Sequence, residues 1–203
     1  MLNGRWLLLA IPAALVAAYA GAVLLFPTFG APFLHERLAD MPLAVVAHLS
    51  GGATALFAGA FQVNAALRRR ALRVHRWLGR VYVAGVAVGG AGGLVLATRS
   101  QGGLVTHWGF GLLAIVWLVT TTAGYVRIRQ RDDVTHRRWM LRSYALTFAA
   151  VTLRIYLPLA MIGGIPFIEA YRVISWACWV PNLVAIEWWL RRSVRVGAPP
   201  LTV

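Results

Sequence analysis

Apolar residues in this chain run in six long stretches, which short arginine-rich connections separate. Each stretch has about 20 residues, the length that an α-helix needs to cross the hydrocarbon core of a bilayer. We expect membrane-spanning helices over Trp6 to Phe26, Leu43 to Leu67, Leu78 to Thr98, Leu104 to Val126, Trp139 to Ile162 and Val173 to Leu190. The pattern therefore predicts an all-α, polytopic membrane protein in which residues 1–203 form a single integral membrane domain.

The composition agrees with this interpretation. The chain is 60% hydrophobic and 13% charged, with a mean hydropathy of +0.69, which excludes an ordinary soluble domain. All 20 basic residues are arginine, and the formal net charge is +14. Because these arginines lie in the connections, where basic residues act as topology signals, we expect membrane lipids rather than nucleic acid as partners.

The arginines also predict how the chain is oriented. Two connections are rich in arginine: the one after the second stretch has Arg68, Arg69, Arg70, Arg73, Arg76 and Arg80, and the one after the fourth has Arg127, Arg129, Arg131, Arg137, Arg138 and Arg142. The other three connections have one arginine each. The positive-inside rule therefore places both termini in the cytoplasm and the protein in the cytoplasmic (inner) membrane.

Two segments near the N-terminus differ from the other spans and connections. Arg5 and the sequence Ala18-Tyr19-Ala20 resemble parts of a signal peptide, but the apolar run continues to Phe26, which favours a retained helix. The sequence PFLHERLADMP, residues 32–42, is bounded by prolines. We expect it to form a short helix on the outer surface.

Four histidines occur at repeated positions relative to the spans. His48 precedes His75 by 27 residues, and His107 precedes His136 by 29 residues. Other residues repeat with them: Gly52 and Gly111 follow the outer histidines by four, and Tyr82 and Tyr144 follow the inner ones by seven and eight. We infer a duplicated helical hairpin that forms a central four-helix bundle, with one histidine pair at each membrane face.

Haem suits two histidines on separate helices better than zinc does. Zinc needs three or four protein ligands, whereas porphyrin supplies four nitrogens and leaves two axial positions for imidazoles. We therefore predict two b-type haems, one per leaflet, with iron ligands from His48 and His107 and from His75 and His136. Gly52 and Gly111 would leave room for the outer ring. One haem, or none, stays an alternative.

Arginines near these positions are candidate contacts for haem propionates. The candidates are Arg76, Arg80, Arg142 and Arg154. Arg154 lies inside the fifth span, so it is either a propionate or quinone contact, with Glu169 as a candidate partner, or a side chain that reaches the lipid headgroups. Glu187 precedes Arg191 by four residues, which favours an ion pair within one helix.

The glycines of the third span have two interpretations. Gly85, Gly89, Gly90, Gly92 and Gly93 would allow close helix packing or the approach of a flat ligand. The sequence contains no motif for catalytic residues.

Three segments carry a family resemblance: HLSGGATALFAGAFQ (48–62), HRWLGRVYV (75–83) and HRRWMLRSYALTFAAVTLR (136–154). They resemble a family of bacterial membrane proteins known as domain of unknown function 2306, for which no activity is settled. The placing of the four histidines is similar to that in cytochrome b-561, a six-helix family with two haems. That similarity implies electron transport across the membrane, as in a membrane oxidoreductase.

Competing functions remain open at this stage. A non-redox membrane module would use the arginine-dense connections to bind an assembly partner or anionic lipid. A transporter with its site between the repeats is a third interpretation. The electron donor and acceptor are unassigned, quinone is one candidate, and the sequence is compatible with a homodimer or a larger complex.

Overall fold

A computed structural model describes residues 4–26 and 28–195 of the chain. Its elements are α1 (Gly4–Leu25), α2 (Pro32–Asp40), α3 (Pro42–Gln62), α4 (Ala65–Arg70), α5 (Leu72–Ala97), α6 (Leu104–Arg129), α7 (Asp133–Thr147), α8 (Ala149–Ile162), α9 (Phe167–Ala177) and α10 (Val180–Arg195). Six helical segments are long and apolar enough to cross a membrane, with α7–α8 and α9–α10 each counting as one span. The predicted all-α membrane fold is confirmed.

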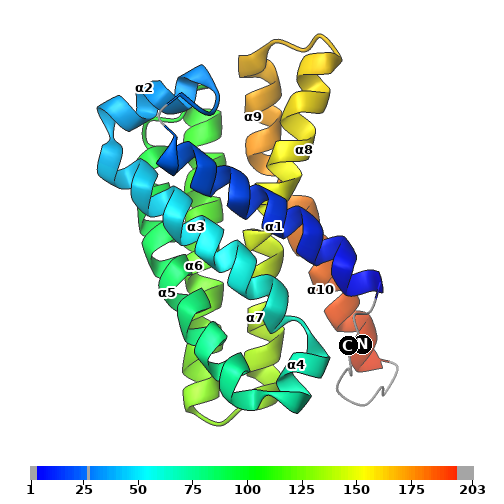
Figure 1. Ribbon diagram of the computed structural model, residues 1–203. Coiled ribbons are helices and arrows are strands. Elements are labelled where there is room, and N and C mark those ends of the chain that lie inside the picture. Colours follow the sequence, from blue (N-terminus) through cyan, green and yellow to red (C-terminus); the bar gives the residue numbers. More distant parts are fainter. Residues whose placement is uncertain (1–3, 27, 196–203) are drawn as a thin grey trace.

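Four of these helices form the central bundle. Contacts join α3 to α5, α5 to α6, α6 to α7 and α7 back to α3, so α3 and α6 face each other diagonally, as do α5 and α7 (Figure 1). The two antiparallel pairs, α3 with α5 and α6 with α7, correspond to the predicted hairpins. Outside the bundle, α1 packs across α3, and α8, α9 and α10 pack against α1, α6 and α7 respectively.

The bundle has two distinct ends. One end carries α4, the start of α5 and the connection from α6 to α7, and we call it the arginine-rich end (Figure 1). The start of α1 lies at this end too, because the Trp6 indole donates to the Ala60 carbonyl near the end of α3, at 2.7 Å. The opposite end carries α2 and the α5–α6 connection, and we call it the far end. The predicted short helix within 32–42 is confirmed as α2, which ends at Asp40.

The second span ends earlier than the sequence predicts. The predicted stretch reaches Leu67, but α3 ends at Gln62 and α4 starts as a separate helix. Asn64 is the cause, because its side-chain oxygen accepts from the amides of Ala66 (3.0 Å) and Leu67 (3.1 Å) as a helix N-cap does. This break turns the arginines of α4 away from the axis of α3.

Local signals set the other boundaries. The Asp132 carboxylate caps α7 by accepting from the Thr135 amide at 3.0 Å, and this hydrogen bond holds the pKa of Asp132 below its usual range. The last span is interrupted just before Pro181, since α9 ends at Ala177 and α10 begins at Val180. Proline lacks the amide proton that would continue the helix.

Candidate functional site

The structure places one histidine pair at each end of the bundle. His75 and His136 lie near the starts of α5 and α7, at the arginine-rich end, while His48 and His107 lie near the starts of α3 and α6, at the far end. Within the described residues, no three His, Cys, Asp or Glu side chains gather into a metal-ion site. A metal group that brings its own ligands is therefore the kind that these histidine pairs could serve.

The two histidines at the arginine-rich end lie on the diagonally placed helices α5 and α7. His75 and His136 lie close enough for their charges to interact, and the charges of Arg68 and Arg76 also act on His75. Arg137 lies in the same group, because its charge interacts with that of Arg68. We call His75, His136, Arg68, Arg76 and Arg137 the inner cluster.

Hydrogen bonds orient the rings of the inner cluster. The Nδ1–H of His136 donates to the Gly124 carbonyl of α6 at 2.8 Å. A carbonyl can only accept, so Nδ1 carries the proton in this bond, and in the neutral imidazole Nε2 then has the lone pair. Among the described residues, the buried Nδ1 of His75 has no hydrogen-bond partner. The inner cluster therefore offers one oriented imidazole and one buried ring nitrogen whose hydrogen-bonding capacity is unused.

His48 at the far end has the same ring orientation as His136. Its Nδ1–H donates to the Gly89 carbonyl of α5 at 2.9 Å, which again leaves Nε2 free. Gly93 makes room for the ring, because a Cβ at that position would lie 3.0 Å from Nδ1 of His48. Each of these histidines thus uses a glycine carbonyl on a neighbouring helix.

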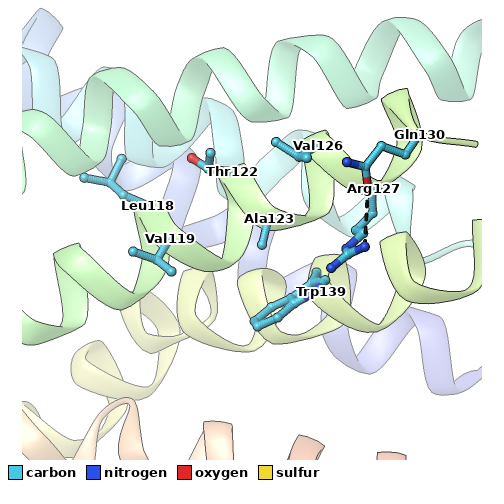
Figure 2. A pocket seen from close by; sticks show the side chains of 8 residues that line it. All are labelled: Leu118, Val119, Thr122, Ala123, Val126, Arg127, Gln130 and Trp139. Atoms are coloured by element: carbon cyan, nitrogen blue, oxygen red, sulfur yellow. Dashed lines mark hydrogen bonds between the residues drawn. The ribbon is translucent and has the colours of Figure 1, made fainter. Parts of the chain in front are cut away.

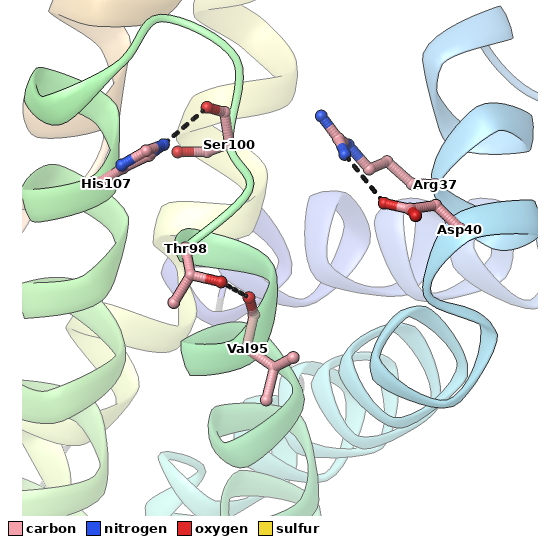
Figure 3. A network of polar contacts seen from close by, with 6 residues as sticks. All are labelled: Arg37, Asp40, Val95, Thr98, Ser100 and His107. Atoms are coloured by element: carbon pink, nitrogen blue, oxygen red, sulfur yellow. Dashed lines mark hydrogen bonds and ion pairs between the residues drawn. The ribbon is translucent and has the colours of Figure 1, made fainter.

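His107 is oriented differently. Its Nε2–H donates to the Ser100 carbonyl at 3.1 Å, in the connection between α5 and α6 (Figure 3). The same figure shows the nearby pair of Arg37 and Asp40, whose Nη1 and Oδ2 are 3.5 Å apart. The imidazole of His107 therefore faces the surface connection, and its Nε2 is engaged there.

The contacts do not bring His48 and His107 together. A Cβ on Gly93 would lie 3.0 Å from the His48 ring and 3.9 Å from the Cβ of Ala114, so His48 is level with that part of α6. Ala114 follows His107 by two helical turns, which is about 10 Å at 1.5 Å per residue. His48 is therefore deeper in the bundle than His107, against the expectation of a shared iron.

Arg154 is the charged neighbour of His48. It is close enough for its charge to act on the imidazole, and its guanidinium carbon lies 5.3 Å from the centre of the Tyr19 ring of α1. Its Nη1 donates to the Ala150 carbonyl at 3.1 Å. In the part of the chain that the structure describes, Arg154 forms no ion pair, so the candidate partner Glu169 is not paired with it.

The other predicted arginines have different surroundings. Arg142 is engaged with Glu187 of α10 through two hydrogen bonds, one of them from Nη2 to Oε2 at 3.1 Å, so its guanidinium is not free for a propionate. The expected ion pair of Glu187 with Arg191 is replaced by this contact. Arg80 is exposed on α5, and Arg76 is exposed beside His75.

The glycines differ in what surrounds them. A Cβ on Gly52 would meet nothing within 4 Å, and one on Gly111 would meet only the Ala97 Cβ at 3.9 Å, so there is space beside both. By contrast, a Cβ on Gly92 would lie 2.7 Å from the Ala44 carbonyl oxygen, and one on Gly89 would lie 2.7 Å from the Gly52 amide. Those glycines of the third span pack α5 directly on α3, which leaves no room there for a flat ligand.

A polar network fills the middle of the bundle between the two ends. The Tyr82 hydroxyl contacts Ser143 Oγ at 2.6 Å and Thr147 Oγ1 at 2.8 Å, and the Trp117 indole donates to Thr147 at 2.8 Å. Thr121 contacts Ser143 at 2.6 Å. We did not predict this network, although hydroxyl residues in the fourth and fifth spans were a signal for it.

The comparison with known families agrees with the resemblance in the sequence. A family described as predicted membrane protein (DUF2306) matches residues 45–190, which cover the helices from α4 to α9 entirely and most of α3 and α10. The chain belongs to this family. Within the DUF2306 match lie all four histidines, both glycines that follow the outer histidines and Arg154. No curated protein and no solved structure matches the chain.

Proposed function

We propose that this protein is a b-type membrane cytochrome that transfers electrons between redox carriers, with haem held by His75 and His136 at the arginine-rich end. The observation that carries the proposal is the inner cluster itself. Two imidazoles from diagonally placed helices lie there within range of each other's charge, and the hydrogen bond from Nδ1 of His136 orients that ring. A hydrogen bond of this kind, from the other ring nitrogen to a carbonyl, is typical of metal-ligating histidines.

The residues of the inner cluster fit the chemistry of a haem. The buried Nδ1 of His75 has no hydrogen-bond partner among the described residues. A role as axial ligand, with the ring turned as that role requires, would explain this unused nitrogen. Arg68, whose charge acts on His75, and Arg137, which follows His136 in the chain, would pair with propionates. When bound, haem with two histidine ligands supplies one-electron transfer and has no open position for oxygen.

We propose one haem, whereas the spacing of the histidines alone predicts two. At the far end, His107 uses Nε2 for the Ser100 carbonyl and is about two turns away from the level of His48. His48 and Arg154 instead form a polar site near Tyr19 inside the membrane. We propose that a lipid-soluble electron carrier of the quinone class binds at that site, because the ring oxygens of a quinone accept hydrogen bonds from arginine and imidazole.

An absorption spectrum of the purified protein tests the haem. We expect a Soret band that sharpens and shifts on dithionite reduction, and a pyridine haemochrome assay that gives about one haem per chain. His75→Ala and His136→Ala should each abolish the band. His35→Ala is the matched control, because His35 is on α2 and its ring forms a hydrogen bond only with the Phe29 carbonyl among the described residues.

A second variant separates ligand loss from misfolding. His136→Asn keeps an N–H that can donate to the Gly124 carbonyl, so we expect a folded protein that lacks haem. If the assay gives two haems per chain and His107→Ala loses one of them, then His48 and His107 hold a second haem at the far end. A folded protein without any Soret band would refute the cytochrome and leave the non-redox membrane module.

A further inference from the structure

A groove about 530 Å³ in volume runs along the outer side of α6 and α7 (Figure 2). Its wall is an apolar stretch of α6 from Leu118 to Val126, and its end is polar, with Arg127, Gln130 and the α7 residue Trp139. Val119, Val126 and Arg127 are exposed on the bundle surface. The groove therefore faces the surrounding lipid rather than the interior of the bundle. Its volume is within the range of small-molecule sites.

The length of the groove matches one leaflet of a bilayer. Leu118 lies near the middle of α6, and Arg127 follows it by nine residues, which is about 13 Å along the helix. Half of the hydrocarbon core of a bilayer is about 15 Å thick. An apolar chain in this groove would thus reach from the bilayer midplane to the headgroup region. Trp139 is located where tryptophan is enriched, at the membrane interface.

The polar end of the groove carries positive charge. Arg127 Nη1 donates to Gln130 Oε1 at 3.4 Å, and within the described residues it forms no ion pair. Asp132 is the carboxylate whose charge interacts with Arg127, but its Oδ1 accepts from the Thr135 amide. The segment 127–138 contains five arginines and two aspartates, so its net charge is positive.

We propose that this groove binds one anionic phospholipid, with the phosphate at Arg127 and Gln130 and one acyl chain along the wall of α6. The positive charge of the arginines favours an anionic headgroup. A zwitterionic lipid gains little affinity from an arginine cluster, whereas an anionic lipid gains about a fivefold affinity for each nearby arginine. The apolar wall and its length select a diacyl lipid over free phosphate. The site is independent of any haem, since it lies on the lipid-facing side of α6.

Native mass spectrometry of the detergent-purified chain, titrated with dioleoylphosphatidylglycerol or dioleoylphosphatidylcholine, tests the site. We expect tighter binding of phosphatidylglycerol, and a loss of about fivefold in its affinity in Arg127→Gln. Arg129→Gln is the matched control: it removes the same charge from the same helix, but Arg129 contacts Tyr125 at 3.4 Å and does not line the groove. The affinity of Arg129→Gln for phosphatidylglycerol should stay within about twofold of that of the unchanged protein.

Filling the wall tests the acyl chain separately. Ala123→Phe should weaken the binding of both lipids while leaving the thermal unfolding of the protein unchanged, because Ala123 lines the open groove. Equal losses in Arg127→Gln and Arg129→Gln would indicate diffuse surface electrostatics and overturn the site. Equal affinities for the two lipids would overturn the headgroup assignment. Loss of a homodimer in Ala123→Phe, with lipid binding unchanged, would show that a second copy of the chain occupies the groove.

Discussion

Single side chains in the middle of the bundle satisfy one another's hydrogen bonds, and Thr147 connects most of them. Its hydroxyl accepts from the Trp117 indole, contacts the Tyr82 hydroxyl and donates to the Ser143 carbonyl at 2.9 Å. Thr147 is 5% exposed, so no water replaces a lost partner. Buried donors left without partners lower the stability of the fold.

We therefore expect Thr147→Val to destabilise the protein by about 1–2 kcal/mol, the upper part of the range for hydrogen bonds between membrane helices. Valine keeps the shape of threonine but leaves the Trp117 indole and the Tyr82 hydroxyl with fewer partners. Thermal unfolding in detergent measures the change. Thr122→Val is the control, since Thr122 is exposed on the neighbouring helix, and it should leave the unfolding temperature within a degree or two. Equal stability of the two variants would show that the network contributes nothing.

The sequence predicts which residues make up the candidate site but not how each side chain is oriented. Spacing was enough to single out His48, His75, His107 and His136. It could not say which ring nitrogen of each is free, because that depends on carbonyls of other helices or of the surface connection. The sequence predicted Arg142 as a propionate contact, but α10 places Glu187 beside it and the two side chains form hydrogen bonds.

At the scale of helices, the closest contact in the bundle is between α3 and α5. Gly51, Gly85, Gly89 and Gly92 let the two backbones touch, and a Cβ on Gly51 would overlap the Gly89 backbone. Such stripes of small residues allow membrane helices to approach closely, where packing rather than the hydrophobic effect drives association. This contact also sets the depth of His48 against α5.

Replacing Gly51 should therefore separate the helices, whereas replacing its neighbour should not. We expect Gly51→Ala to destabilise the protein by about 1–3 kcal/mol through overpacking. Gly52→Ala is the matched control, because a Cβ there meets nothing within 4 Å and alanine favours the helix. Unfolding of both variants under the same conditions, in detergent, gives the comparison. A more stable Gly51→Ala would mean that α3 and α5 are farther apart than described.

For the whole molecule, the sequence predicts the orientation that the fold alone leaves open. The structure gathers α4, the start of α5 and the α6–α7 connection at one end, and the positive-inside rule assigns that end to the cytoplasm. Cys178 is buried, so it interferes little with labelling of introduced cysteines. Arg99, in the connection at the far end, and Gln130, at the arginine-rich end, are both exposed.

Labelling of intact cells with a membrane-impermeant maleimide tests this orientation. Arg99→Cys should react directly, and Gln130→Cys should react only after the membrane is permeabilised. The unchanged protein, with Cys178 alone, gives the background signal. The reverse pattern would place the inner cluster outside and contradict the predicted orientation.

The sequence by itself determined the membrane class, the six spans, the repeated hairpin and the identity of the four histidines. These follow from runs of apolar residues and from spacing along one chain, which are local properties. Only the tertiary structure decided that His75 and His136 lie within range of each other's charge while His48 and His107 lie at different depths. That outcome depends on how far α3, α5 and α6 slide past one another, and glycine contacts between helices fix this offset. Contacts between distant segments, such as these and the pairing of Arg142 with Glu187, leave no periodic signal in the sequence.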